Sequence, residues 1–205
     1  MARDTRSIVK LSRREGYALH PKAHKALVKR TSAPGQAANA RMRNKPSQYS
    51  LQLREKQKVK RLYGLLEKQF SNLMKEASRK QGQSGEVLLQ FLEQRADNAV
   101  YRAGFASSRR AARQLVSHGH FMLNGRRIDV PSIRLRPGDE LIVRDHSKQT
   151  EYFKKLDDVS PAPSTTPGWI KVNRKNLAFS VTGTPARDDA EPEIKEQLIV
   201  EYYSR

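Results

Sequence analysis

Apolar residues recur at steps of three and four along residues 59–77, as they do on one face of an α-helix. The stripe consists of Val59, Leu62, Tyr63, Leu66, Phe70, Leu73, Met74 and Ala77. Ser47 can cap the N-terminus of this helical stretch, and Gly64 interrupts it. The pattern therefore predicts two helices, over about 47–63 and 65–81.

Two more helices are predicted further along the chain. Ser84 can cap a third helix, whose apolar stripe runs to Val100 and which Gly104 ends. Ser107 can cap a short fourth helix that ends at Gly119. Glycine is the residue most often found just after the last turn of a helix, so both ends are marked in the sequence.

Short alternating or apolar runs predict strands in the second half of the chain. Such runs on either side of Asn124-Gly125 predict a β-hairpin with a type I′ turn. A further strand is expected at Leu141–Val143, and Trp169–Val172 and Leu198–Tyr203 are short β-like runs. The chain thus belongs to the α+β class, with a small sheet behind several helices.

Residues 1–46 lack such periodicity. They contain turn signals at Glu15-Gly16 and Pro34-Gly35, and Pro46 closes the stretch. We expect an extended, mostly irregular arm with one helical turn around Pro21–Arg30. Alone in water such an arm buries too little apolar surface to stay ordered, so it is expected to fold against a partner.

The composition identifies that partner as a polyanion. Of 205 residues, 40 are Lys or Arg and 21 are Asp or Glu, a net charge of +19. No apolar run is long enough for a membrane span, and the absence of cysteine excludes disulfides and thiolate metal sites. A charge so far from zero destabilises a compact fold unless a polyanion neutralises it. Nucleic acid is the first candidate.

The charge is concentrated at the front of the chain. Residues 1–60 hold 16 basic and 3 acidic side chains, whereas residues 151–205 hold 8 and 9. A basic N-terminal arm commonly contacts nucleic acid. An organelle transit peptide would also be basic and poor in acids, but here the basic run continues past residue 60 into a patterned helix.

One face of the first predicted helix is basic. It consists of Arg54, Lys56, Lys58, Lys60 and Arg61, and Glu55 is the only acid within 54–61. The alternative is a solvated helix face, but Lys and Arg without acidic partners one turn away repel one another. The pattern favours phosphate binding.

A second candidate surface follows Ser107. Arg109, Arg110 and Arg113 share one face of the fourth helix, and Arg109 and Arg113 are expected to project opposite Leu115 and Val116. Polar and small residues then lie beside this row: His118, Gly119, His120, Asn124 and Gly125. Such a surface suits phosphates and sugar hydroxyls, and it recognises RNA shape rather than base sequence. A solvent-exposed arginine-rich helix is the alternative.

Metal and catalytic chemistry are thinly represented. His20 and His24 have helical spacing and His118 and His120 flank a glycine, but neither pair has the third and fourth ligands of a zinc site. Glu93 and Asp97, four residues apart with Arg95 between them, suggest structural pairing. No cofactor and no catalytic residue are expected.

The motifs of the middle segment resemble the S-four RNA-binding module. They are Leu92-Glu93-x-Arg95-x-Asp97-Asn98-x-Val100-Tyr101-Arg102-x-Gly104-Phe105-Ala106, Ser108-Arg109-x-x-Ala112-Arg113-Gln114-Leu115-Val116-x-His118-Gly119-His120, Asn124-Gly125 and Pro131-Ser132. That module also occurs in pseudouridine synthases, tyrosyl-tRNA synthetases and a heat-shock protein. The flanking segments distinguish among these: Lys10-Leu11-Ser12-Arg13-Arg14-Glu15-Gly16, Pro34-Gly35-Gln36, Leu53-Arg54-Glu55-Lys56-Gln57-Lys58 and Leu198-Ile199-Val200-Glu201-Tyr202-Tyr203-Ser204-Arg205. They resemble the bacterial-type small-subunit (30S) ribosomal protein family S-four over nearly the whole chain.

The resemblance implies a mainly helical domain built from both chain ends, with the small S-four module of two helices and an antiparallel sheet inserted into it. The expected boundaries are 1–46 for the basic arm, 47–90 plus 151–205 for the helical domain, and 91–150 for the module. Many relatives carry a four-cysteine zinc knuckle in the arm, which this chain lacks, so a metal-free arm is expected. The usual Pro-Gly-Gln-His-Gly is here Pro34-Gly35-Gln36-Ala37-Ala38, so the resemblance does not extend to the RNA contact of this segment.

The resemblance further implies a cytoplasmic protein of the small ribosomal subunit that binds the five-prime domain of small-subunit rRNA early in assembly. It implies a contribution to decoding accuracy beside proteins S-five and S-twelve, near the mRNA entrance. The residues expected to contact RNA are Arg3, Lys10, Arg13, Arg14, Arg41, Arg43, Lys45, Tyr49, Arg54, Lys56, Gln57, Lys58, Lys60, Arg61, Arg109, Arg110, Arg113, Gln114, His118, Gly119, His120, Asn124 and Gly125.

The alternative function is an RNA-modifying enzyme of the pseudouridine-synthase type that uses the same module to capture its substrate. Such an enzyme needs a catalytic aspartate in an Arg-Leu-Asp context, which Arg95-Ala96-Asp97 resembles only superficially. It also needs a sizeable catalytic domain after the module, and only 55 residues follow position 150.

Overall fold

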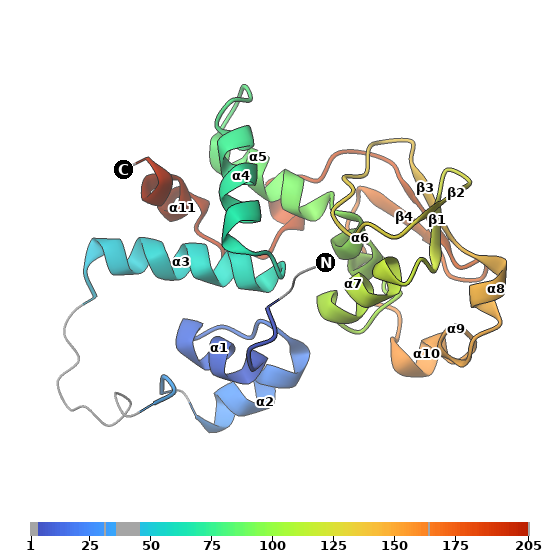
Figure 1. Cartoon of the computed structure of the whole chain (residues 1–205), viewed down its shortest axis with the longest axis horizontal. Helices are drawn as coiled ribbons and strands as arrows, with labels where there is room; N and C mark the ends of the chain where they lie inside the picture. The colour runs from blue at the N-terminus through green and yellow to red at the C-terminus, as the bar shows by residue number, and fades with distance from the viewer. Residues whose placement is uncertain (1–3, 31, 36–45, 164, 205) are drawn as a thin grey trace. The chain divides into compact units, whose positions relative to one another are not determined.

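The computed structural model describes residues 4–30, 32–35, 46–163 and 165–204. The chain forms two compact units, Met1–Leu88 with Pro192–Arg205, and Leu89–Glu191. The first unit combines both ends of the chain, and it is helical (Figure 1). The second unit holds residues 151–191, which the sequence analysis assigned to the helical domain.

The first unit begins with two helices where an irregular arm was expected. They are α1 (Ile8–Glu15) and α2 (Pro21–Lys29), joined at Gly16 in a left-handed conformation with a φ of 64°. Leu11, Leu19 and Ala23 are buried within this helical pair. The expectation of one helical turn was wrong because these few apolar residues come from both helices and no single window of the sequence shows them as a stripe.

Helices α3 (Gln48–Leu62) and α4 (Glu67–Ala77) agree with the two helices predicted from the apolar stripe. The Ser47 side chain accepts a hydrogen bond from the backbone N–H of Ser50 at the start of α3. Gly64 has a φ of 68°, a conformation that glycine adopts at low cost, and it separates the helices.

The C-terminal segment forms helix α11 (Glu196–Tyr203) and not the β-like run that was predicted for Leu198–Tyr203. This helix lies beside α3, with Ile199 fully buried (Figure 1). It also approaches α5 (Ser84–Glu93) at Gly85, where an added Cβ would lie 2.9 Å from Cγ of Glu196. Packing against distant segments, rather than local propensity, makes residues 196–203 helical.

The second unit packs helices on a five-stranded antiparallel sheet of order β2-β1-β3-β5-β4. Its elements are α6 (Ala96–Arg102), α7 (Arg109–Ser117), β1 (Phe121–Leu123), β2 (Arg126–Ile128), β3 (Glu140–Val143), α8 (Asp145–Lys148), α9 (Glu151–Lys154), α10 (Leu156–Val159), β4 (Ile170–Asn173), β5 (Ala178–Val181) and a 3₁₀ turn at Arg187–Asp189. Phe105, Phe121 and Phe179 are fully buried in its core. The α+β class is confirmed.

One helix of the prediction is two helices in the structure. The chain is extended at Arg95, between α5 and α6, where Arg95 pairs with Arg134 in an isolated β-bridge. The backbone N–H of Leu135 donates to the carbonyl of Gln94, which replaces the helical bonds lost there. The break depends on a segment some forty residues away, so the local pattern could not indicate it.

The predicted hairpin is confirmed between β1 and β2. Asn124 and Gly125 have φ values of 48° and 80°, as a type I′ turn requires. The strand at Trp169–Val172 corresponds to β4, whereas β5 was not predicted. β5 has no clear alternation, because Ala178, Phe179 and Val181 are all buried.

Candidate nucleic-acid interface

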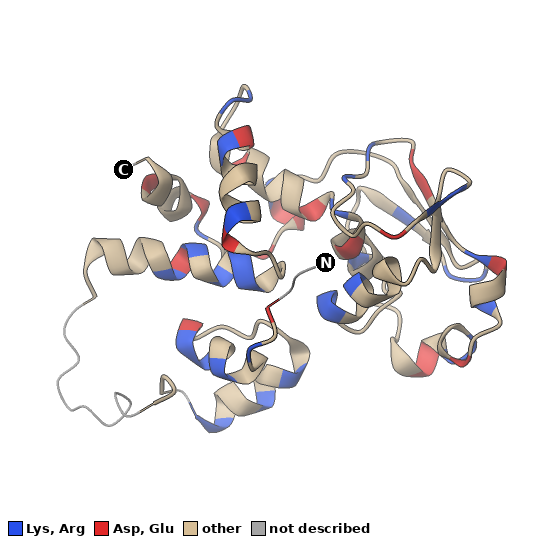
Figure 2. Cartoon of the chain, viewed as in Figure 1, with Lys and Arg blue, Asp and Glu red and all other residues tan. Residues whose placement is uncertain are grey.

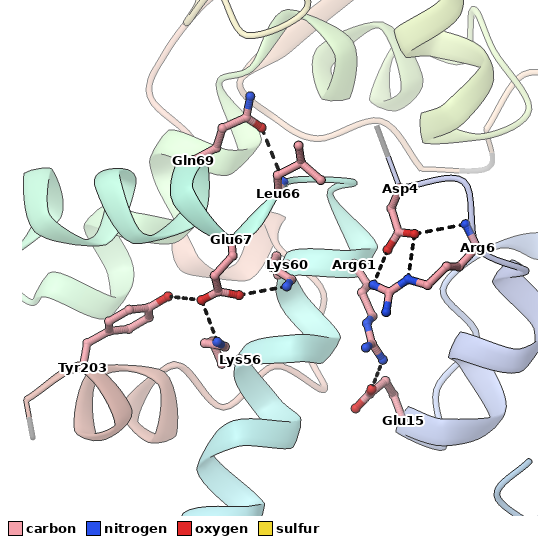
Figure 3. Close-up of polar contacts among 10 residues, drawn as sticks. All are labelled: Asp4, Arg6, Glu15, Lys56, Lys60, Arg61, Leu66, Glu67, Gln69 and Tyr203. Carbon is pink, nitrogen blue, oxygen red and sulfur yellow. Dashed lines mark hydrogen bonds and ion pairs between the residues drawn. The ribbon is translucent and has the colours of Figure 1, made fainter. Parts of the chain in front are cut away.

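Two lysines of α3, Lys56 and Lys60, contact one carboxylate at the start of α4. Nζ of Lys56 lies 2.6 Å from Oε1 of Glu67, and Nζ of Lys60 lies 2.8 Å from Oε2 (Figure 3). The hydroxyl of Tyr203, on α11, also donates to Glu67 at 3.1 Å. Burial opposes ionisation of Glu67, but the hydrogen bonds from the two lysines outweigh it and hold its pKa at about 2.

The arginines of α3 pair with a second carboxylate, from the end of α1. The side chain of Glu15 is fully buried, and it accepts from Nη1 of Arg54 at 3.2 Å and from Nη1 of Arg61. Figure 3 shows the contact with Arg61. Burial raises the pKa of Glu15, against the attraction of these arginines, and burial lowers the pKa of Arg61. Among the described residues, Oε2 of Glu15 has no hydrogen-bond donor.

Two further predicted residues of α3, Lys58 and Tyr49, also have contacts within the first unit. Nζ of Lys58 lies 2.8 Å from Glu55 and donates to the carbonyl of Glu193. Tyr49 is exposed and lies against the ring of Tyr202, with 5.8 Å between centroids. The argument that this basic face lacks acidic partners was therefore wrong, because the partners come from α1, α4 and within α3 itself.

Helices α1 and α2 carry several exposed cations of the first unit, and their Lys and Arg residues are blue in Figure 2. Lys10 and Arg14, both predicted, are exposed on α1, whereas Arg13 is half-buried and donates to the carbonyl of Ser32. The sequence analysis missed an exposed row on α2, whose members are Lys22, Lys25 and Lys29. Their spacing of three and four residues was the signal, since it places them on one face once the segment is a helix.

In the second unit, two of the three predicted arginines of α7 enter a polar network. Arg109 donates to Oδ1 of Asn98 at 2.8 Å and to Oε1 of Glu191 at 2.9 Å. Arg113 lies 3.8 Å from Asp97, which a bidentate contact also joins to Arg95. The structural pairing expected of Asp97 is confirmed.

Glu93 completes this network from the end of α5. Its carboxylate accepts two hydrogen bonds from Arg102, at 2.9 and 3.0 Å, and one from the side-chain amide of Asn98. The carboxylate side chain is 1% exposed, so its charge is compensated inside the unit. The structural pairing expected of Glu93 is also confirmed.

The outer face of α7 carries Arg110, Gln114 and His118, which are exposed. At the end of this helix Gly119 has a φ of 71°, and a Cβ there would lie 2.5 Å from Nε of Arg127. The missing side chain therefore makes room for the Arg127 guanidinium. Arg127 is an exposed cation of β2 that was not predicted as an RNA contact, although it lies two residues after the predicted turn.

The other predicted residues of this surface have structural contacts. Nδ1 of His120 lies 3.0 Å from the hydroxyl of Ser147, and burial together with the nearby His118 and Arg144 lowers the pKa of His120. The Asn124 side chain accepts from the N–H of Glu140 and donates to Asp139, so it holds the hairpin turn to β3. Gly125 is exposed at the tip of that turn.

Some predicted contacts lie outside the described residues. They are Arg3, Arg41, Arg43 and Lys45, together with the altered positions Gln36, Ala37 and Ala38. Within the described ranges, no three His, Asp or Glu residues are grouped so that they could hold a metal ion. Nor is any helix in those ranges long and apolar enough to cross a membrane.

Two protein families match successive parts of the chain, and they meet close to the boundary between the two units. The family "Ribosomal protein S4/S9 N-terminal domain" matches residues 3–93, and the family "S4 domain" matches residues 94–141. "Small ribosomal subunit protein uS4" of Chlorobium limicola is 48% identical over 206 residues, and that of Clostridioides difficile is 47% identical over 211 residues. "Small ribosomal subunit protein uS4A" of Symbiobacterium thermophilum is 46% identical, and all three alignments cover both chains in full.

The chain belongs to the uS4 family of small ribosomal subunit proteins. Members of this family are structural proteins, so the alternative of a pseudouridine-synthase-like enzyme does not hold. The geometry agrees, because the carboxylate of Asp97 is buried and bound by Arg95. The S4 domain is an RNA-binding module, and α6, α7 and the β1–β2 hairpin lie within it.

Proposed function

We propose that this uS4-family chain is a primary binder of the five-prime domain of small-subunit rRNA and nucleates assembly of the subunit body. In the assembled subunit it contributes to translational accuracy beside proteins S-five and S-twelve, close to the mRNA entrance. RNA is bound by two surfaces. One consists of the exposed cations of α1 and α2, and the other of the outer face of α7 with the β1–β2 hairpin.

The exposed row of Lys22, Lys25 and Lys29 on α2 is the observation that carries this proposal. In the described part of the chain no carboxylate pairs with these lysines, whereas each cation of α3 forms an ion pair with Glu15, Glu55 or Glu67. A row of exposed lysines on one helix face suits the phosphate backbone, which supplies most of the sequence-independent affinity of nucleic-acid binding. Direct readout of bases is not required.

Titrations of the full-length protein against isolated rRNA domains test the proposal. We expect the tightest binding to the five-prime domain, with the logarithm of the affinity falling linearly with the logarithm of salt concentration. The slope is expected to be about −0.7 to −0.9 per phosphate neutralised. Equal affinity for every rRNA domain, or an affinity that does not change between low and moderate salt, would contradict the proposal.

The protein neighbours are tested in assembled subunits. Cross-linking followed by mass spectrometry is expected to join this chain to S-five and S-twelve, and a cross-link to mRNA is expected near the entrance. Reconstitution of subunits without this protein is expected to arrest before the body forms. Complete bodies assembled in its absence would show that it does not nucleate assembly.

A further inference from the structure

Strands β4 and β5 enlarge the sheet beyond the segment that matches the S4 domain, which ends at residue 141. β5 pairs with β3, and β4 forms the edge of the sheet next to β5. Side chains of these three strands line a pocket with a volume of about 750 Å³. That volume lies within the range of sites that hold nucleotide-sized ligands.

The lining of this pocket is positively charged. Lys148, Lys171, Arg174 and Lys175 line it together with a single carboxylate, that of Glu140. Two of the four cations are already engaged: Lys148 lies 2.8 Å from Asp145, and Arg174 lies 2.8 Å from Asp157.

The other two cations of the lining, Lys171 and Lys175, are exposed, and in the described residues neither forms an ion pair. The pocket therefore keeps an excess of positive charge after its internal pairs are formed. An anionic partner complements such a surface.

The polar and apolar groups of the pocket suit a nucleic-acid strand. Oδ1 of Asn173 accepts from the backbone N–H of Asn176, which leaves the Asn173 NH₂ group as a donor at the edge of the sheet. Ile142 and its cross-strand neighbour Ala178 form an apolar part of the lining, on the same face of the sheet as Lys171 and Asn173. A phosphate backbone can lie along the lysines while a base covers the apolar part.

We propose that this pocket on β3, β5 and β4 binds a single-stranded segment of RNA through its phosphate groups. This inference rests on the proposed function, and it adds an RNA site distinct from α7 and the hairpin. A single strand fits better than a duplex, because only an unpaired base has a free face to place on Ile142 and Ala178. Recognition is independent of sequence, since the contacts are lysine charges and aliphatic surface.

An acidic peptide fits this pocket less well than a phosphate backbone. Carboxylates are bound best by the planar fork of arginine, and the one arginine of the lining, Arg174, donates to Asp157 and to the carbonyls of Gly104 and Ser160. The remaining cations are lysines, which bind phosphate as point charges.

The first test measures binding of full-length protein to a mixed-sequence single-stranded RNA of about 12 nucleotides, a length typical of single-strand sites. The variant Lys171→Ala/Lys175→Ala is expected to bind about fivefold more weakly, as two exposed charge contacts are lost. Its salt slope is expected to be shallower by about 1.4, or 0.7 per phosphate. The matched control, Lys154→Ala/Lys155→Ala, removes the same charge from exposed positions outside the lining and is expected to bind like wild type.

The second test locates the contact in the assembled small subunit. Benzoylphenylalanine in place of Asn176, which lines the pocket, is expected to cross-link to rRNA or mRNA on irradiation. The inference requires both the weaker binding of Lys171→Ala/Lys175→Ala and the cross-link from position 176 to RNA. A cross-link to protein alone, no cross-link, or equal weakening by the two double variants overturns this inference. Wild-type protein that fails to bind the five-prime domain would instead overturn the proposed function, and the cross-link still decides the pocket.

Discussion

Helices α2 and α3 are equally rich in basic residues, but they use them differently. Three of the nine residues of α2 and five of the 15 residues of α3 are Lys or Arg. The lysines of α2 are exposed, whereas the cations of α3 contact Glu15, Glu55 and Glu67. The density of charge along the sequence therefore does not distinguish a phosphate-binding face from an internal ion-pair network.

The difference arises from where the carboxylates lie in the fold. Glu15 precedes the cations of α3 by about forty residues, and Glu67 follows them after the turn at Gly64. Packing of α1 on α3, and the sharp turn into α4, bring both acids to the same helix. Rules for pairs one helical turn apart apply within one helix and do not cover these contacts.

The largest expected effect on stability follows loss of Glu15. The variant Glu15→Ala leaves Arg61, whose side chain is 8% exposed, without its carboxylate. Removing one partner of a buried ion pair is expected to lower the free energy of unfolding by about 3 kcal/mol. Urea denaturation followed by circular dichroism measures this loss, with Glu193→Ala at an exposed position as the control. A loss no greater than that of the control would show that the pair contributes nothing.

A similar effect is expected in the second unit for Arg109. Its side chain is 13% exposed, and its loss removes a hydrogen bond to Oδ1 of Asn98 and one to Glu191, which keeps Arg102 at 3.6 Å. We expect Arg109→Ala to lower the free energy of unfolding by about 2 kcal/mol, the range for hydrogen bonds to charged groups. The sequence alone suggested that this arginine projects from α7 without a structural role. If Arg109→Ala leaves stability unchanged and weakens RNA binding, Arg109 contacts RNA and has no structural role.

Local patterns were sufficient for some elements and insufficient for others. The stripe from Val59 to Ala77 predicted α3 and α4, and the Asn124-Gly125 pair predicted the hairpin, because the determining residues are neighbours in sequence. Helix α11 was missed because burial of Ile199 depends on α3. The break at Arg95 was missed because it depends on the strand-like segment at Arg134.

The candidate RNA-binding surfaces were also only partly predictable from local sequence patterns. The motifs of α7 pointed to the family that the comparisons show, whereas the RNA contacts of the individual cations remain predictions. Which of them face solvent depends on distant partners, such as Glu191 for Arg109. The row on α2 was missed for the opposite reason: its spacing was visible, but too few apolar residues marked the segment as a helix.

The contacts of Glu67 with Lys56, Lys60 and Tyr203 are expected to make the free energy of unfolding depend on pH. Because the folded pKa of Glu67 is about 2 and the ordinary value is 4.5, its stabilisation is fully present above pH 4.5 and is lost as the pH falls toward 2. The side chain is 49% exposed, so we expect only about 1 kcal/mol. The stability difference between wild type and Glu67→Gln should therefore shrink from pH 6 to pH 2. A difference that stays constant over this window would contradict the assignment.

The smallest effect on stability is expected for the α2 row, and it completes the comparison with α3. Lys22, Lys25 and Lys29 are exposed, so the triple alanine variant should unfold within about 0.5 kcal/mol of wild type. Its salt slope for five-prime rRNA binding should nevertheless become shallower by about 2 to 3, or about 0.7 to 0.9 for each phosphate contact. Filter binding over a salt series, with urea denaturation in parallel, measures both quantities.

Exposed cations elsewhere in the first unit provide the control for the α2 row. Lys68→Ala/Lys75→Ala/Arg79→Ala removes the same charge from α4 and the turn after it. If the α2 face binds phosphates, this variant should keep more of the wild-type slope than the α2 variant does, because contact rather than net charge sets the number of counterions released. Equal slopes for the two variants would mean that only the total charge matters. A loss of stability in the α2 variant would mean that its lysines, like those of α3, hold the fold together.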